Sequence, residues 1–390
     1  MLWSQKAREK AYNDFPSFVY IVWKEIQLPE PTEIQREMAK DISNETVQRL
    51  ILEGFRGVAK SFITCAYCVW VLWRHPLWKI EMVSASGGKA SLNSAFIKKI
   101  IQIIPFLDIL RLTDADRRNG LRDTNDLFDV HGAIADISPS VKSVGITGQL
   151  TGTRADILIA DDVEVANNSA TQIQRDKIAE LVREFDAILK PGGRIIYLGT
   201  PQCEDSLYPK LTERGYSTVV YPVYYPANIE ERSFYGEKLG KLLAQRYDSD
   251  PGKWAGLPTD PKRFSAAEVA LRRLAYGKAG FALQFMLNTN LSDAQKYPLR
   301  VSDLIVTNLD MDETSVKWSW ASGTPQRLND TPCTALRGDY FYGPLWRSPE
   351  TQKYDGSMMF IDPSGRGQFQ LASTLNKRFE LRETVEAILI

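Results

Sequence analysis

One short segment of the chain combines the residue types that bind phosphate. Residues 54–61 read Gly-Phe-Arg-Gly-Val-Ala-Lys-Ser, between an apolar run that predicts a strand and another that predicts a helix. In a loop of this spacing, backbone N–H groups and the helix N-terminus surround phosphate oxygens. Lys60 is expected to reach the β- and γ-phosphates of a nucleotide, and Ser61 to bind Mg²⁺ through its hydroxyl.

Three small residues of this loop, Gly54, Gly57 and Ala59, are expected to border the phosphates. Ala59 departs from the plain pattern, which has glycine at that position. The alternative interpretation is a glycine-containing turn that opens a buried helix and binds nothing.

Polar residues follow two other apolar runs. After residues 157–160, Asp161 is expected to bind the water shell of Mg²⁺, and either Asp162 or Glu164 to polarise an attacking water. Adjacent carboxylates repel each other, and a metal ion removes that cost. The alternative is a strand that ends in a solvated acidic turn. After residues 195–198, the hydroxyl of Thr200 could sense a γ-phosphate, although Gly-Thr-Pro by itself predicts only a turn.

Upstream of the loop, Gln35 follows a Pro-Thr turn. Its amide carries two donor hydrogens and one acceptor oxygen, which suit the edge of an adenine. The alternative is that Thr32 caps a helix and Gln35 is exposed to solvent. The sequence leaves both interpretations open.

Short strands alternate with helices from residue 50 onward, which predicts an α/β fold with a mostly parallel sheet and helices on both faces. Ligands of such sheets bind at the carboxyl ends of the strands, where the loop lies. The glycine-rich run 145–154 is either a mobile loop near the nucleotide or a plain connection. The expected strands are 50–53, 79–84, 127–130, 156–160, 194–198 and 217–223, and the expected helices are 1–27, 61–73, 89–104 and 171–189.

Composition limits the class of protein. The 390 residues are 44% hydrophobic and 25% charged, as in ordinary globular proteins, and they are enough for two or three domains. Lys and Arg total 48, as do Asp and Glu, so any contact with nucleic acid must come from local patches. No stretch approaches twenty uncharged apolar residues, which argues against a membrane span.

Taken in order, these motifs resemble the large subunit of tailed-phage terminases, in particular the DNA maturase B group of short-tailed phages. The resemblance runs from about residue 31 to about residue 367. It implies a P-loop NTPase core with a central, mostly parallel sheet flanked by helices, a small lid subdomain, and the start of an RNase H-like nuclease. The expected divisions are residues 1–220, 221–345 and 346–390.

The resemblance also assigns roles to individual residues. Arg56 matches a loop arginine that neutralises transition-state charge, and Thr200 matches a motif that couples hydrolysis to movement. Family members usually place Glu directly after the Mg²⁺ carboxylate, whereas this chain has Asp162, so the water-activating role stays divided between Asp162 and Glu164. The other implied contacts are those of Gln35 with adenine, Lys60 and Ser61 with phosphate and Mg²⁺, and Asp161 with Mg²⁺.

Residues 357–365 resemble the first strand of the terminase nuclease, with Asp362 as its first metal carboxylate. Two-metal hydrolysis needs several carboxylates from different elements. Only 28 residues follow Asp362 (390 − 362), and they read as a polar segment and an amphipathic helix. We therefore expect a truncated nuclease domain without cutting activity.

The resemblance implies ATP and Mg²⁺ as cofactors. Its implied partners are double-stranded DNA, a portal protein, a small terminase subunit and other copies of the chain in a ring, with no membrane. The expected location is the host cytoplasm, transiently at the procapsid portal. Two other hypotheses are a helicase-like DNA translocase and a non-catalytic prophage remnant that binds nucleotide or DNA.

Overall fold

The computed structural model describes residues 3–202, 206–288, 313–317, 322–327 and 340–353. The chain divides into two compact units, Met1–Ser292 and Asp293–Ile390. The described part of the second unit consists of two antiparallel strand pairs. Strand β8 (Glu313–Ser315) pairs with β11 (Thr351–Lys353), and β9 (Ser322–Arg327) pairs with β10 (Tyr340–Pro344). The position of Asp362 and the predicted tail helix lie outside the described residues.

The first unit is built on a seven-stranded sheet in the order β3-β4-β2-β5-β6-β1-β7. Every neighbouring pair is parallel except β3 and β4, which run antiparallel. This mixed, mostly parallel sheet with flanking helices confirms the predicted fold class. The strands are β1 (Arg49–Gly54), β2 (Ile80–Ser84), β3 (Leu127–Phe128), β4 (Val141–Gly145), β5 (Ala155–Asp161), β6 (Leu189–Gly199) and β7 (Ser217–Tyr221).

Alternate residues of the central strands point into different hydrophobic cores. On β5, Ile157 and Ile159 belong to one core, whereas Leu158 and Ala160 belong to the other. Successive residues of a strand face opposite sides of the sheet, so a strand covered on both faces must be apolar throughout. Residues 157–160 meet this requirement. Two covering layers therefore fix β5 and bring Asp161, its last residue, to the carboxyl edge of the sheet.

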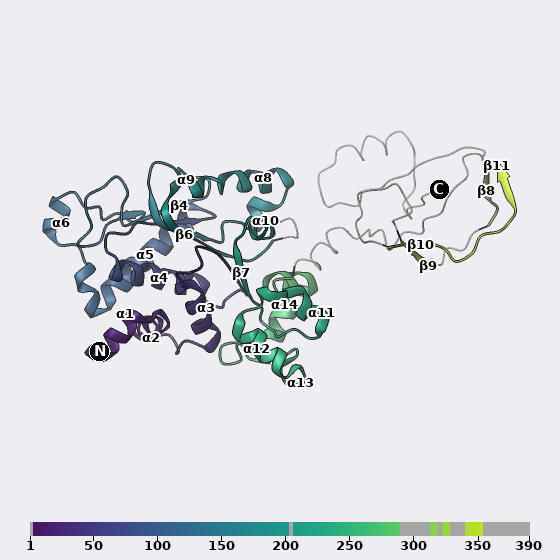
Figure 1. Ribbon diagram of the computed structural model, residues 1–390, viewed down its shortest axis with the longest axis horizontal. Coiled ribbons are helices and arrows are strands. Elements are labelled where there is room, and N and C mark those ends of the chain that lie inside the picture. The colour runs from purple at the N-terminus through teal and green to yellow at the C-terminus, as the bar shows by residue number, and fades with distance from the viewer. Residues whose placement is uncertain (1–2, 203–205, 289–312, 318–321, 328–339, 354–390) are drawn as a thin grey trace. The chain divides into compact units, whose positions relative to one another are not determined.

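The first core is covered by the N-terminal helices and by the helices that follow β1 and β2 (Figure 1). The prediction of a single helix over residues 1–27 was wrong. Asp14 has an extended backbone (φ −132°), and its carboxylate accepts a hydrogen bond from the Ser17 N–H, so it ends one helix and caps the next. These helices are α1 (Gln5–Asn13), α2 (Phe15–Glu25), α3 (Glu33–Ser43), α4 (Lys60–Arg74) and α5 (Gly87–Ile103), with a 3₁₀ turn (Pro105–Leu110) and α6 (Asp114–Arg118) after them.

The opposite face is covered by shorter helices, which lie above the strands in Figure 1. The predicted helix over residues 171–189 is broken, because three-residue hydrogen bonds tighten the chain at 180–185 and turn both Val182 and Phe185 into the core. Strand β4 was missed, since polar Lys142 and Ser143 weaken its short apolar pattern. The helices here are α7 (Ala166–Ser169), α8 (Gln172–Leu181), α9 (Glu184–Ile188) and α10 (Leu207–Glu213).

The chain after β7 folds back onto the first core and returns to the phosphate-binding loop. Phe264, Phe281 and Phe285 are buried in the same core as β1 and α4. The backbone N–H of Arg56 donates to the carbonyl of Gln284 (3.0 Å), which ties the loop to the end of α14. The elements are α11 (Ile229–Tyr235), a 3₁₀ turn (Gly236–Lys238), α12 (Lys241–Ser249), α13 (Pro251–Trp254) and α14 (Ala266–Gln284).

The predicted division of the chain at residues 220 and 345 stays a prediction. Within the described residues, no helix is long and apolar enough to span a bilayer.

Candidate nucleotide-binding site

The loop between β1 and α4 has the backbone of a phosphate-binding loop. Gly57 has φ 93° and Ala59 has φ 78°, so two positions occupy the left-handed region that glycine tolerates best. A Cβ at Gly54 would lie 3.1 Å from a side-chain atom of Val58 and 3.2 Å from one of Lys60, so these two side chains would have to shift to admit it. Ala59 thus adopts the conformation of the glycine that the motif usually has there, at the energetic cost that its Cβ brings.

Lys60 begins α4 and turns its side chain back over the loop. Its Nζ donates to the carbonyl of Gly54 and to the Thr200 hydroxyl (3.4 Å), and only 8% of the residue is exposed. Burial lowers the pKa of Lys60, while the nearby charges of Asp162 and Asp161 act in the opposite direction. The ammonium group is therefore held between the loop and the end of β6.

Ser61 and Asp161 face each other across the carboxyl edge of the sheet. The Ser61 hydroxyl lies 3.0 and 3.1 Å from the two carboxylate oxygens of Asp161, and Asn93 donates to the same carboxylate at 2.8 Å. Hydroxyl and carboxylate oxygens are ligands that Mg²⁺ prefers, and phosphates usually supply the rest of its shell. Among the described residues no group of three or more His, Cys, Asp or Glu could hold a metal alone. The pair therefore fits a Mg²⁺ ion that arrives with a nucleotide.

Asp162 has a left-handed backbone (φ 45°) and an ion pair with Lys89 of α5. The Lys89 ammonium lies 2.9 Å from an Asp162 oxygen and 3.5 Å from an Asp161 oxygen. Sequence reasoning gave Lys89 no role. The parallel pairing of β2 with β5 places Ser84 opposite Asp161, and α5 begins three residues after Ser84.

Glu164 is buried, with 2% of its surface exposed, and its two oxygens differ. Oε2 accepts the backbone N–H of Leu207 at 2.6 Å, whereas Oε1 has no hydrogen-bond partner among the described residues. Burial raises the pKa of Glu164 to about 6, although backbone hydrogen bonds from Leu207 and Gln202 oppose the shift. A carboxylate with this pKa and one free oxygen is suited to accept a proton near neutral pH.

Thr200 follows β6 directly, and Gly199 makes this arrangement possible. A side chain at position 199 would collide with the ring of Tyr208 in α10. The Thr200 carbonyl accepts from the Gln202 side chain (2.9 Å), and its hydroxyl accepts from Lys60. Thr200 therefore links the loop to the segment that leads into α10.

Gln35 is buried behind the loop, contrary to the alternative that exposed it. Thr32 and Gln35 form a reciprocal cap of α3, and the Gln35 Nε2 also donates to the carbonyl of Val58 (3.1 Å). The expected cap is present, and the amide additionally supports the loop. The contact with adenine stays a prediction.

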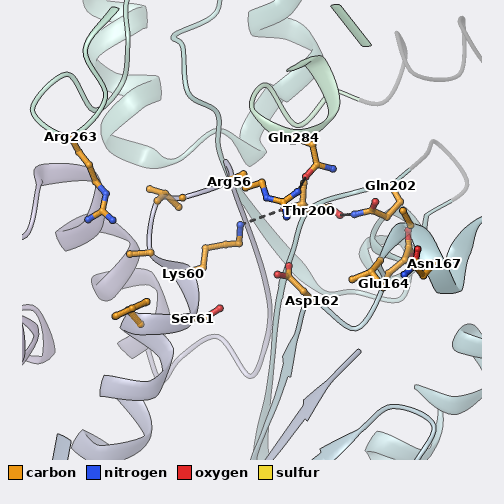
Figure 2. A pocket seen from close by; sticks show the side chains of 16 residues that line it. Arg56, Lys60, Ser61, Asp162, Glu164, Asn167, Thr200, Gln202, Arg263 and Gln284 are labelled. Carbon is orange, nitrogen blue, oxygen red and sulfur yellow. Dashed lines mark hydrogen bonds between the residues drawn. The ribbon is translucent and has the colours of Figure 1, made fainter. Parts of the chain in front are cut away.

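One cavity of about 590 Å³, within the usual range for small-molecule sites, is lined by Lys60, Ser61, Asp162, Glu164 and Thr200 together with other residues of the loop (Figure 2). The sequence did not predict the contribution of Arg263 or the role of Gln284. The Gln284 side-chain oxygen accepts from the Arg56 guanidinium (3.2 Å), and Figure 2 shows the two side chains meeting above Thr200. No motif marks Arg263, which reaches the cavity because Phe264 packs edge-on against Phe55 at 5.1 Å.

The parallel sheet, the loop with its Lys-Ser pair and the facing carboxylates define a P-loop nucleotide-binding protein. Over 377 residues, 95% of the chain, the sequence is 48% identical to the terminase large subunit of Enterobacteria phage T3. The resemblance to terminase large subunits is thereby confirmed. The chain spans 64% of the length of that relative.

Two other comparisons add less. No protein-family profile matches the chain. Among solved structures, the large terminase of bacteriophage HK97 is 14% identical and has a TM-score of 0.39, covering 60% of this chain and 51% of that one. The large terminase ATPase domain of Thermus phage P74-26 is 12% identical with a TM-score of 0.35, covering 66% of this chain and 98% of that one.

Proposed function

We propose that the chain is the ATP-hydrolysing motor subunit of viral DNA packaging, which moves double-stranded DNA into a procapsid. The observation that carries the proposal is that Lys60, Ser61 and Glu164 line one cavity at the carboxyl edge of the sheet, where Asp161 faces the Ser61 hydroxyl. The 48% identity to a terminase large subunit supports it.

In this proposal the loop holds the nucleotide and the opposite wall performs the chemistry. Lys60 and the loop N–H groups bind the phosphates, and Arg56 offsets the charge that develops on them. Ser61 and Asp161 hold Mg²⁺, which neutralises phosphate charge when it is bound. Gln35 supports the loop and contacts the adenine.

We assign water activation to Glu164. Glu164 lines the cavity, its buried Oε1 has no partner among the described residues, and its pKa of about 6 allows it to accept a proton near pH 7. Asp162 instead pairs with Lys89. Thr200 contacts Lys60 and leads into the segment that holds Glu164, so loss of the γ-phosphate is passed on through these contacts.

The proposed partners are double-stranded DNA, a portal protein, a small terminase subunit and further copies of the chain in a ring on the procapsid. The proposed location is the host cytoplasm, with transient docking at the portal.

The test is ATP turnover by the purified chain, with and without DNA and portal-bearing procapsids. Lys60→Ala should lower turnover at least about 100-fold, because the variant loses the cation that faces the transferred phosphate. Substantial turnover in this variant would disprove the site. Strand separation without procapsids would favour a helicase-like translocase, and nucleotide binding without any turnover would favour a non-catalytic remnant.

A further inference from the structure

Lys89 lies at a position that a loaded site has to clear. Its ammonium group bridges Asp162 (2.9 Å) and Asp161 (3.5 Å), and Asp161 is the carboxylate that faces the Ser61 hydroxyl. Nothing in the proposed mechanism uses this lysine. The single positive charge of Lys89 thus offsets part of the repulsion between the two adjacent carboxylates at the end of β5.

A lysine ammonium and a hydrated divalent cation compete for such a place. Both need the outward oxygens of the same carboxylates, and two cations in contact across one carboxylate repel each other. The remaining bonds of Asp161, from Ser61 and Asn93, come from uncharged groups and carry no such conflict. Binding of a metal at Ser61 and Asp161 therefore requires Lys89 to move or to weaken its contact.

Lys89 is also built to move, in contrast to Lys60. The Lys89 side chain is 34% exposed and belongs to the first turn of α5, whereas Lys60 is buried under the loop. A flexible, partly solvated lysine exchanges a carboxylate for water at small cost. The contact is therefore weak enough to be exchanged and close enough to compete.

We propose that Lys89 is a built-in counterion of the Asp161–Asp162 pair that Mg²⁺ displaces, so that Lys89 sets the Mg²⁺ concentration at which the nucleotide site fills. Before loading, the lysine keeps two adjacent carboxylates from destabilising the end of β5. On loading it is released toward the cavity. The inference rests on the proposed function for the identity of the cation.

The experiment compares Lys89→Met with Lys98→Met in the full chain. Lys98 is a matched control, because it also lies on α5 and pairs with an aspartate (Asp123, 2.6 Å), but away from the cavity. The first measurement is the Mg²⁺ concentration that gives half-maximal binding of a fluorescent ADP. We expect Lys89→Met to need about tenfold less Mg²⁺ than the wild type, a typical strength for coupling between two sites. Lys98→Met should need as much Mg²⁺ as the wild type.

The second measurement is the thermal unfolding midpoint without nucleotide. Lys89→Met should unfold at a lower temperature than the wild type in EDTA and recover when Mg²⁺ is added, while Lys98→Met should show no recovery. An unchanged or increased Mg²⁺ requirement in Lys89→Met overturns the inference. If fluorescent ADP does not bind the wild type, the proposed function fails, and recovery by Mg²⁺ alone still decides the role of Lys89.

Lys89→Arg is a second control, which separates the loss of charge in Lys89→Met from a folding defect. This variant keeps the charge and the carboxylate contacts, so it should retain the Mg²⁺ requirement of the wild type to within about twofold. A tenfold drop in Lys89→Arg as well would show that charge is not the cause and would overturn the inference.

Discussion

The two walls of the cavity are organised in opposite ways. On the loop wall, Lys60 and the Arg56 backbone have hydrogen-bond partners, and the one strained residue is Ala59. On the acidic wall, Asp161 and Asp162 share a lysine, and Glu164 is buried with a raised pKa and an unpartnered oxygen. The loop wall is thus preorganised for an anion, whereas the acidic wall stores unfavourable charge.

The contrast between the two walls indicates where stability and activity conflict. Buried polar groups that are paired stabilise a fold, and buried groups left unpaired destabilise it while remaining free to react. Changes on the acidic wall should therefore trade activity for stability, whereas changes on the loop wall should not gain stability at the expense of activity.

The largest expected effect is on ATP turnover, and it distinguishes Glu164 from Asp162 on the acidic wall. Glu164→Gln removes the proton acceptor and should lower ATP turnover about 1,000-fold with nucleotide binding unchanged, since a general base contributes about 10² to 10⁴. Asp162→Asn should lower turnover less than about tenfold. Steady-state turnover and ADP binding of both variants measure this, and the reverse order would move the role to Asp162.

The same substitution should stabilise the fold at neutral pH. The folded-state pKa of Glu164 is about 6 against 4.5 for the free group, so the folded chain binds more protons between these values and its unfolding free energy falls as pH rises. Glu164→Gln removes the titrating group, so the unfolding free energy of this variant no longer falls with pH on its account. The unfolding free energy of the variant minus that of the wild type, measured in urea, should grow by about 2 kcal/mol from pH 4 to pH 7. A constant difference across this window would contradict the prediction.

On the loop wall, Gln284→Ala removes the side chain that accepts from the Arg56 guanidinium. The Arg56 backbone bond to residue 284 remains, so the loop should fold normally while turnover falls about threefold to tenfold, the value of one hydrogen bond to a charged group. Gln172→Ala is the matched control, because Gln172 accepts from Arg175 on α8. Equal turnover of Gln284→Ala and the control would show that the contact does not position Arg56.

The smallest effect concerns the strain at Ala59. Glycine tolerates φ 78° without a Cβ clash, so Ala59→Gly should raise the unfolding free energy by about 1 kcal/mol and leave turnover unchanged or higher. Ala95→Gly, on the exposed side of α5, should lower it by about 1 kcal/mol, since glycine is a poor helix former. Chemical denaturation of both variants measures the opposite signs.

Much of the fold followed from local sequence. Residues 157–160 are apolar without interruption, as a strand covered on both faces requires, and the alternation of strands and helices indicates a mostly parallel sheet. Pro-Thr and Asp-Phe-Pro turns define helix starts, although the cap at Asp14 was overlooked. Strand β4 could not be predicted, because Lys142 is accommodated there by long-range contacts, an ion pair with Glu81 of β2 (3.0 Å) and hydrogen bonds to Leu150 and Thr153.

Local sequence was enough to predict the loop, its Lys60-Ser61 pair and the acidic strand end, because each is a contiguous pattern with its own chemistry. Which groups oppose them depends on long-range packing. Arg263 and Gln284 reach the cavity from the chain before α14 and from its end, and Lys89 reaches the two aspartates from α5, through strand register and aromatic packing that no local pattern encodes. The orientation of Glu164 toward Leu207, forty-three residues later, is likewise a long-range contact. Packing brings such distant residues together, and residues that are neighbours in space do not follow a fixed spacing in the sequence.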